Sequence, residues 1–158
     1  MDMGGAVNYQ AEHYSQCYRE LEQFHHAHWQ EVEGFQDKIP LDVDHDTFCH
    51  LDQAGALAVI TARDENGSLQ GYALWQAAVN PKHQGTRMAA NISFYVKPEA
   101  RGHWVGKRLL AESERWLRMN GVKLTDLCVK NGHDDLGKLA GLEGYRAAET
   151  HWQKWIGD

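Results

Sequence analysis

Residues 91–110 of the chain read NISFYVKPEARGHWVGKRLL, and this stretch decides how the rest of the sequence is interpreted. Its first part, residues 91–96, is rich in β-branched and aromatic side chains and predicts a β-strand. Pro98 ends that strand, because a proline has no N–H to donate to a neighbouring strand. A helix is predicted to begin near Val105, since apolar residues recur from there at helical spacing. The stretch therefore predicts a strand, a basic turn and a helix in succession.

The turn between this strand and this helix has the composition of a phosphate-binding loop. Gly102 and Gly106 let the backbone approach a ligand closely, and Arg101, Lys107 and Arg108 carry positive charge. The first turn of a helix also has free N–H groups and a partial positive charge. An ordinary connection with solvated basic residues has the same composition, so spacing alone leaves both interpretations open.

The same residues resemble a known motif. The run V-x-P-E-x-R-G-x-x-V-G-K-x-L-L is similar to the coenzyme A pyrophosphate motif of the GNAT superfamily of N-acetyltransferases, whose pattern is Arg/Gln-x-x-Gly-x-Gly/Ala. Arg101 matches the first position and Gly106 the last, whereas Trp104 stands where the middle glycine is usual. The resemblance implies that Trp104 offers its backbone N–H and that its side chain points away from the phosphates.

The rest of the chain predicts an α+β fold. Residues 1–9 are expected to form a flexible or extended lead-in. Helices are predicted at residues 11–32, 45–54, 105–119 and 136–142, and strands at 56–62, 69–79, 88–96, 123–129 and 145–156. Asp42 or Asp44 is expected to cap the second helix. This order predicts one domain, residues 1–158, with a mixed, mostly antiparallel sheet flanked by helices. By resemblance, the strands 91–96 and 123–129 splay apart around the coenzyme's pantetheine arm.

Composition narrows the class of protein. A chain of 158 residues with a formal net charge of −6 favours one soluble domain and argues against a nucleic-acid backbone as the main partner. The acidic balance suits a cationic amine. The 3 cysteines, Cys17, Cys49 and Cys128, form no C-x-x-C pair, which favours reduced thiols in the cytoplasm. No apolar run has membrane-spanning length, so no membrane partner is expected.

The resemblance implies a set of coenzyme-binding residues. The strand backbone would pair with pantetheine, the loop would bind the pyrophosphate, and an asparagine after the later strand would contact the coenzyme arm. These residues are Phe94, Tyr95, Val96, Arg101, Gly102, His103, Trp104, Val105, Gly106, Lys107 and Asn131. Core packing for the strand residues and a plain turn for Asn131 are the structural alternatives.

The catalytic groups are less evident. Many superfamily members carry a tyrosine on the last short helix, where this chain has Leu139 and Ala140. Many also carry a carboxylate on the strand before the motif, where residues 91–93 are Asn-Ile-Ser. Removing a proton from the amine needs a base. The candidates are His83, His133 and Glu12, together with His13, and each can equally be a surface residue.

The first two helices resemble the wall of the superfamily's acceptor pocket. His25, Trp29, Phe35 and Trp75 are the candidate wall residues, and they suggest an aromatic, amphipathic or peptide acceptor. His25 and His28 lie one helical turn apart, a spacing that can bind zinc. No H-E-x-x-H motif accompanies them, so no metal site is predicted.

The expected function is acetyl-CoA-dependent N-acetylation of a small-molecule or protein amine by direct transfer in a ternary complex. One alternative is a non-catalytic binding or inhibitor protein on the same scaffold, which the unusual Trp104 and the two unfilled catalytic positions favour. Another is a metal-binding helical module with an attached sheet. A homodimer is conceivable if the predicted final strand pairs between two copies.

Overall fold

The fold is built on a five-stranded sheet whose strands follow one another in the order β1-β2-β3-β4-β5. The computed structural model describes residues 6–102 and 104–158. The strands are β1 (Asn8–Glu12), β2 (Leu57–Arg63), β3 (Leu69–Val79), β4 (Arg87–Val96) and β5 (Val122–Asp126). The first four pair antiparallel, and β5 pairs with β4 in parallel. The predicted mixed, mostly antiparallel sheet is confirmed.

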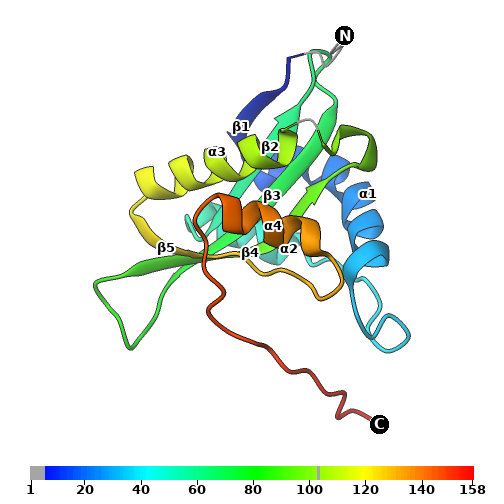
Figure 1. Ribbon diagram of the computed structural model, residues 1–158, viewed down its shortest axis with the longest axis vertical. Coiled ribbons are helices and arrows are strands. Elements are labelled where there is room, and N and C mark those ends of the chain that lie inside the picture. Colours follow the sequence, from blue (N-terminus) through cyan, green and yellow to red (C-terminus); the bar gives the residue numbers. More distant parts are fainter. Residues whose placement is uncertain (1–5, 103) are drawn as a thin grey trace.

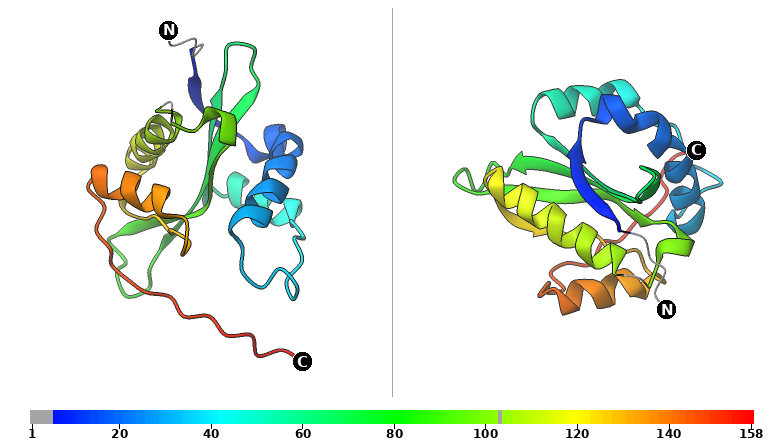
Figure 2. Two further views of the ribbon diagram at one scale, coloured as in Figure 1. Left: turned by 45° about the vertical axis from the view of Figure 1, so that its right-hand side comes forward. Right: turned by 90° about the horizontal axis from the view of Figure 1, so that it is seen from above.

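Helices cover both faces of this sheet (Figures 1 and 2). The helices α1 (Tyr14–Val32) and α2 (His45–Gln53) lie on one face, and α3 (Val105–Met119) and α4 (Asp134–Leu142) lie on the other. A single 3-10 turn, η1 (Pro98–Ala100), connects β4 to the loop before α3. Because both faces are covered, β2 is buried at nearly every position and reads as a continuous apolar run.

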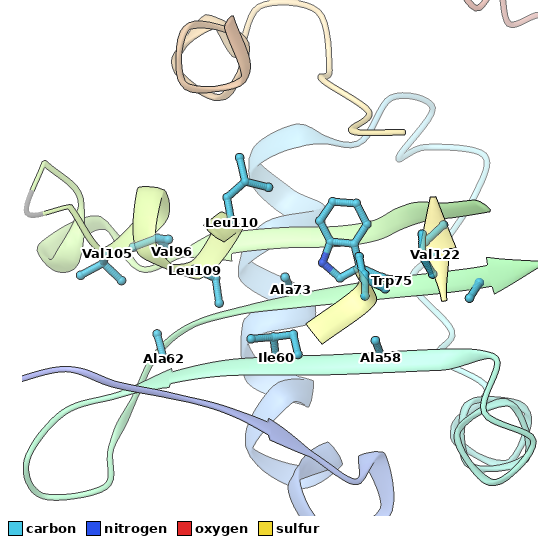
Figure 3. Packing of buried hydrophobic residues seen from close by; sticks show 13 residues of the cluster. Ala58, Ile60, Ala62, Ala73, Trp75, Val96, Val105, Leu109, Leu110 and Val122 are labelled. Atoms are coloured by element: carbon cyan, nitrogen blue, oxygen red, sulfur yellow. The ribbon is translucent and has the colours of Figure 1, made fainter. Parts of the chain in front are cut away.

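Alternate strand residues divide between two hydrophobic clusters. Ile60, Ala73 and Trp75 face α3 and pack with Leu109 and Leu110 (Figure 3). The second cluster lies under α1 and α2, where its largest buried members are Tyr14, Tyr72, Leu21 and Leu74. This alternation follows from the two-residue period of a strand. The same alternation determines which β4 side chains face α1 and α2 and which face α3 and α4.

The local signals in the sequence place most elements correctly. The Asp44 side chain accepts a hydrogen bond from the Thr47 backbone N–H at 2.9 Å and caps α2, as predicted. The strand predicted at residues 69–79 has these same bounds. Gly121, with φ of +80°, follows the end of α3 in the left-handed conformation that glycine favours.

Three predictions about the elements are wrong. Residues 8–12, expected to be lead-in and the start of the first helix, form β1 by pairing with β2, so α1 begins at Tyr14. The strand predicted at residues 123–129 is shorter and mostly exposed, because β5 is the last strand of the sheet and only Val122 is buried. Residues 145–156, predicted as the final strand, have no regular structure.

The C-terminal segment, residues 146–158, runs away from the body of the protein (Figure 1). Trp152 is 92% exposed and Ile156 is 87% exposed. Tyr145, just before this segment, stays at the sheet, with its phenol oxygen 3.1 Å from Thr125 Oγ1. An alternating pattern forms a strand only when another strand pairs with it. Residues 145–156 therefore form no strand that could pair between two copies.

Candidate functional site

The site centres on a split in the sheet, defined here as residues 91–96 of β4, which no longer pair with β5. The last β4–β5 pair is Ala90 with Asp126, whereas pairing with β3 continues to Val96. At the start of the split, Asn91 Oδ1 accepts a hydrogen bond from the Cys128 backbone N–H at 2.6 Å. One edge of β4 is therefore open to an extended partner that carries amide groups. The predicted splaying of the two strands is confirmed.

The loop after the split leads into the first turn of α3. Trp104 occupies the N-cap position with φ of +64° and ψ of −3°, which is the left-handed conformation. Its side chain is 69% exposed. Trp104 thus keeps the backbone geometry that a glycine adopts easily. A Cβ on Gly106 would lie 3.7 Å from Leu139 Cδ2 and 3.8 Å from Val96 Cγ2, so alanine would fit at this position.

The left-handed conformation of Trp104 makes a testable prediction about stability. At an ordinary helical or extended position, glycine is less stable than alanine. At Trp104 we expect the reverse: Trp104→Gly should have a free energy of unfolding about 1 kcal/mol higher than Trp104→Ala. Both variants lose the contact between the Lys107 ammonium and the indole ring, 5.3 Å away, so the comparison isolates the backbone. Urea unfolding measures the difference, and an alanine variant at least as stable as the glycine variant would contradict the assigned φ.

The two basic side chains that flank the loop are already paired within the protein. Arg101 donates from Nη1 and Nη2 to the two carboxylate oxygens of Glu31 at 2.9 and 2.8 Å, and from Nε to the Val96 carbonyl at 2.8 Å. Lys107 Nζ lies 3.1 Å from Glu143 Oε1, just past the end of α4. Anion binding in this loop would therefore rely chiefly on backbone N–H groups and the start of α3.

Apart from Asn131 and His103, the predicted coenzyme-binding residues lie in the split, its loop or the first turn of α3. Tyr95 faces α1, whereas Phe94 and Val96 pack on the α3 side. Gly102 has φ of +79°, and Asn131 is exposed in the turn before α4. Val105 is buried at the start of α3. His103 lies outside the described residues.

The predicted wall of the acceptor pocket is only partly on the expected face. His25 is 7% exposed on α1, and its Nδ1 lies 3.0 Å from the Tyr72 hydroxyl. Trp29 is half-buried near the end of α1, and Phe35 is exposed in the following loop. Trp75, by contrast, is wholly buried on the α3 side (Figure 3). It cannot line a pocket beside α1, because its neighbour Leu74 is the residue that faces that helix.

Burial sets the protonation behaviour of the groups under α1. It lowers the pKa of His25 to about 4, and the neighbouring His45 and His28 act in the same direction. It also raises the pKa of Tyr72, an effect that the Ser93 hydroxyl partly offsets. Both side chains are therefore neutral at pH 7 and joined by a buried hydrogen bond.

The four candidate bases do not come together. His13 is exposed just before α1, and its Nδ1 lies 3.3 Å from Asp52 Oδ2. Glu12 lies on β1 and pairs with Arg63 at 3.1 Å, so its carboxylate is occupied at the far edge of the sheet. His83 is exposed in the turn before β4, at the end of that strand opposite the α3 loop. His133 precedes α4 and is close enough to Glu31 to help lower the pKa of that carboxyl, although Arg101 has the larger effect. Of the four, His133 is the one whose charge acts on the Glu31–Arg101 pair next to the loop.

Sequence reasoning missed the residues that link α1 to the split. Glu31 contacts Arg101 in the loop after β4, and Glu33 contacts Lys130 after β5 at 3.1 Å. The Tyr95 ring lies between two groups, with the His28 ring and the Arg101 guanidinium each 5.4 Å from it. No local pattern marks these contacts, because the partners are distant in sequence.

Across residues 6–102 and 104–158, no group of three or more His, Cys, Asp or Glu side chains is arranged to hold a metal ion. Within the same residues, no helix combines the length and the apolar character needed to cross a membrane.

Comparison with known proteins places this fold. A search of curated proteins finds no match. Among solved structures, a ribosomal-protein-alanine N-acetyltransferase from Brucella melitensis biovar Abortus 2308 is 22% identical, with 97% of this chain and 99% of that chain covered and a TM-score of 0.68. A transcriptional regulator from Bacillus halodurans C-125 is 18% identical, with 96% and 100% covered and a TM-score of 0.75.

An aminoglycoside acetyltransferase from an uncultured soil metagenomic sample, solved in complex with trehalose, is 13% identical, with 99% and 97% covered and a TM-score of 0.73. At these identities the likeness concerns the fold alone. The family model of the acetyltransferase (GNAT) family, however, matches residues 11–139, which include α1, the split, the α3 loop and most of α4. The chain therefore belongs to the acetyltransferase (GNAT) family.

Proposed function

We propose that this protein is an acetyl-CoA-dependent N-acetyltransferase that transfers the acetyl group directly to an amine of a small molecule or a protein. The observation that carries the proposal is the open edge of β4 at the split, followed directly by the loop and the first turn of α3. A pantetheine arm has amide groups that can pair with such an edge, and a pyrophosphate suits the free N–H groups of a helix start. We also propose that it acts in the cytoplasm.

The transfer would need few groups from the protein. The amine nitrogen attacks the thioester carbonyl, a C–N bond forms, the C–S bond breaks, and the proton released by the amine must reach a base. Of the four candidates, His133 is favoured because its charge acts on Glu31, the partner of Arg101 in the loop after the split. Holding the donor and the amine in line supplies much of the rate enhancement.

The acceptor is proposed only as an amine. Two structural neighbours are described as acting on different acceptors, a ribosomal-protein alanine and an aminoglycoside. On α1, His28 lies beside Tyr95 and Trp29 is half-buried, which suits an amine attached to an apolar or aromatic group. A panel should therefore include peptide amino termini and polyamine or aminoglycoside substrates.

The first experiment is calorimetric titration of the purified protein with acetyl-CoA and with desulpho-CoA. We expect micromolar dissociation constants for both, because the proposed contacts are made by the pantetheine arm and the pyrophosphate rather than by the sulfur. Absence of binding by both ligands would overturn the proposal.

The alternative is a non-catalytic binding protein on the same fold. The scattered positions of Glu12, His83 and His133 favour it, since they leave no assembled acid–base pair. Coenzyme binding in the titration without turnover on the amine panel would support this alternative.

A further inference from the structure

The side chain of Arg101 is fixed by three different groups. Its guanidinium forms a bidentate pair with Glu31 on α1, donates to the Val96 carbonyl at the end of β4, and lies 5.4 Å from the centre of the Tyr95 ring. Bidentate arginine–carboxylate pairs are more directional than other ion pairs. Arg101 thus connects the acceptor-side helix to the loop that follows the split.

These contacts use three of the five N–H groups of the guanidinium. A pyrophosphate at the start of α3 would have to compete for the guanidinium with the Glu31 carboxylate, the Val96 carbonyl and the Tyr95 ring. Arginine at the first motif position therefore need not bind phosphate through its charge. Its backbone can form part of the coenzyme loop while its side chain contacts α1.

We propose that Glu31 is a positioning residue that holds the Arg101 side chain. Arg101 then acts as a strut, meaning a fixed link between α1 and the coenzyme loop, and is not a phosphate ligand. The proposal rests on the proposed function, because the loop is assigned to the coenzyme there. The strut keeps the loop backbone in place for the coenzyme and keeps the α1 wall, with His28 and Trp29, in place for the acceptor.

Glu33 supplies a matched comparison. It lies two residues further along the chain, carries the same charge, and pairs with Lys130 at 3.1 Å, with side-chain exposures of 38% and 45%. The exposures in the Glu31–Arg101 pair are 34% and 44%. The two pairs are alike in environment, but only one reaches the coenzyme loop. A difference between Glu31→Gln and Glu33→Gln therefore reflects the contact and not the loss of charge.

The sign of the effect of Glu31→Gln on coenzyme A binding separates the two roles of Arg101. If Arg101 is a strut, Glu31→Gln and Arg101→Gln should each weaken binding by about two- to five-fold, as expected for one partly exposed ion pair. The double variant should be no weaker than either single variant. The salt dependence of binding should stay that of the wild type, since no phosphate contact is lost.

If Arg101 is instead a phosphate ligand restrained by Glu31, the results differ in direction. Glu31→Gln would then tighten coenzyme A binding, whereas Arg101→Gln would weaken it by about 20-fold or more and flatten its salt dependence. That pattern would overturn the proposal. The proposal would also be overturned if the effects of Glu31→Gln and Arg101→Gln on binding added fully, to the same extent as the effects of Glu33→Gln and Arg101→Gln.

Amide hydrogen exchange in residues 24–33 provides a test without ligand. The strut predicts that Glu31→Gln and Arg101→Gln each reduce protection there by about two- to five-fold and that the double variant reduces it no further. If the wild type fails to bind coenzyme A, the proposed function fails, and the exchange experiment still decides whether the strut exists. Unchanged protection in both single variants would disprove the strut.

Discussion

Gly106→Asp should lower the affinity for coenzyme A by about 100-fold or more while leaving the fold as stable as the wild type or slightly more stable. Gly106 is the second residue of α3, where the helix begins with free N–H groups. A carboxylate there would occupy the position proposed for the pyrophosphate and would repel its charge. The same carboxylate is favourable for the helix itself, by about 0.3–1 kcal/mol.

This opposition between stability and affinity makes the prediction specific. A variant that bound poorly because it was misfolded would also unfold more easily, and thermal unfolding without ligand would reveal this. Gly106→Ala is the steric control, because a Cβ at this position meets Leu139 and Val96 at ordinary contact distances. Gly106→Asn controls for the size of the side chain. We expect both controls to bind far more tightly than Gly106→Asp.

Calorimetry with coenzyme A measures the effect. Equal affinities for Gly106→Asp and Gly106→Asn would show that negative charge near Gly106 is irrelevant, and the pyrophosphate would then have to be placed elsewhere. An affinity lost equally in all three variants would instead indicate that the loop cannot accept a side chain at this position.

The fold could be predicted where the signals are local. The hairpin turn at residues 64–67, the cap at Asp44 and the stop at Gly121 all act within a few residues, and the elements beside them have nearly the predicted bounds. The errors concern pairing over long distances. β1 exists because residues 8–12 pair with β2, and residues 145–156 lack a partner strand. Alternation gives the propensity for a strand but cannot supply the partner.

The candidate site shows the same division between local features, which could be predicted, and long-range contacts, which could not. The loop motif is contiguous in sequence, so its position at the start of α3 could be predicted, and Trp104 keeps the backbone expected of a glycine. The partner of Arg101 lies 70 residues away in sequence, and no pattern connects it with Glu31. The prediction placed Trp75 on the wrong face, because residues 71–75 of β3 are buried on both faces and these faces have similar apolar composition.

Lowering the pH from 7 to 5 should reduce the free energy of unfolding by about 2 kcal/mol through His25 alone. Burial lowers the pKa of its imidazole from 6.5 to about 4 in the folded protein. Between these two values the unfolded chain binds more protons than the folded chain, so stability is lost as the pH falls. Among the described residues His25 Nε2 is buried without a hydrogen-bond partner, so a proton added there would be a charge with no acceptor.

His25→Asn tests this assignment, because the asparagine amide stands where Nδ1 does and can still bond to the Tyr72 hydroxyl but does not titrate. We expect the variant to be less stable than the wild type at pH 7 and its pH dependence between 7 and 5 to be smaller by about 2 kcal/mol, measured by urea unfolding at each pH.

His28, whose pKa is also lowered, chiefly by burial, adds to the wild-type dependence, and His28→Gln measures that share. His26→Gln is the exposed control on the same helix. An unchanged pH dependence in His25→Asn would mean that the His25 imidazole reaches solvent in the folded wild-type protein. Since His25 lies on the buried face of α1, the loss of stability in acid should also loosen the helix proposed to receive the acceptor.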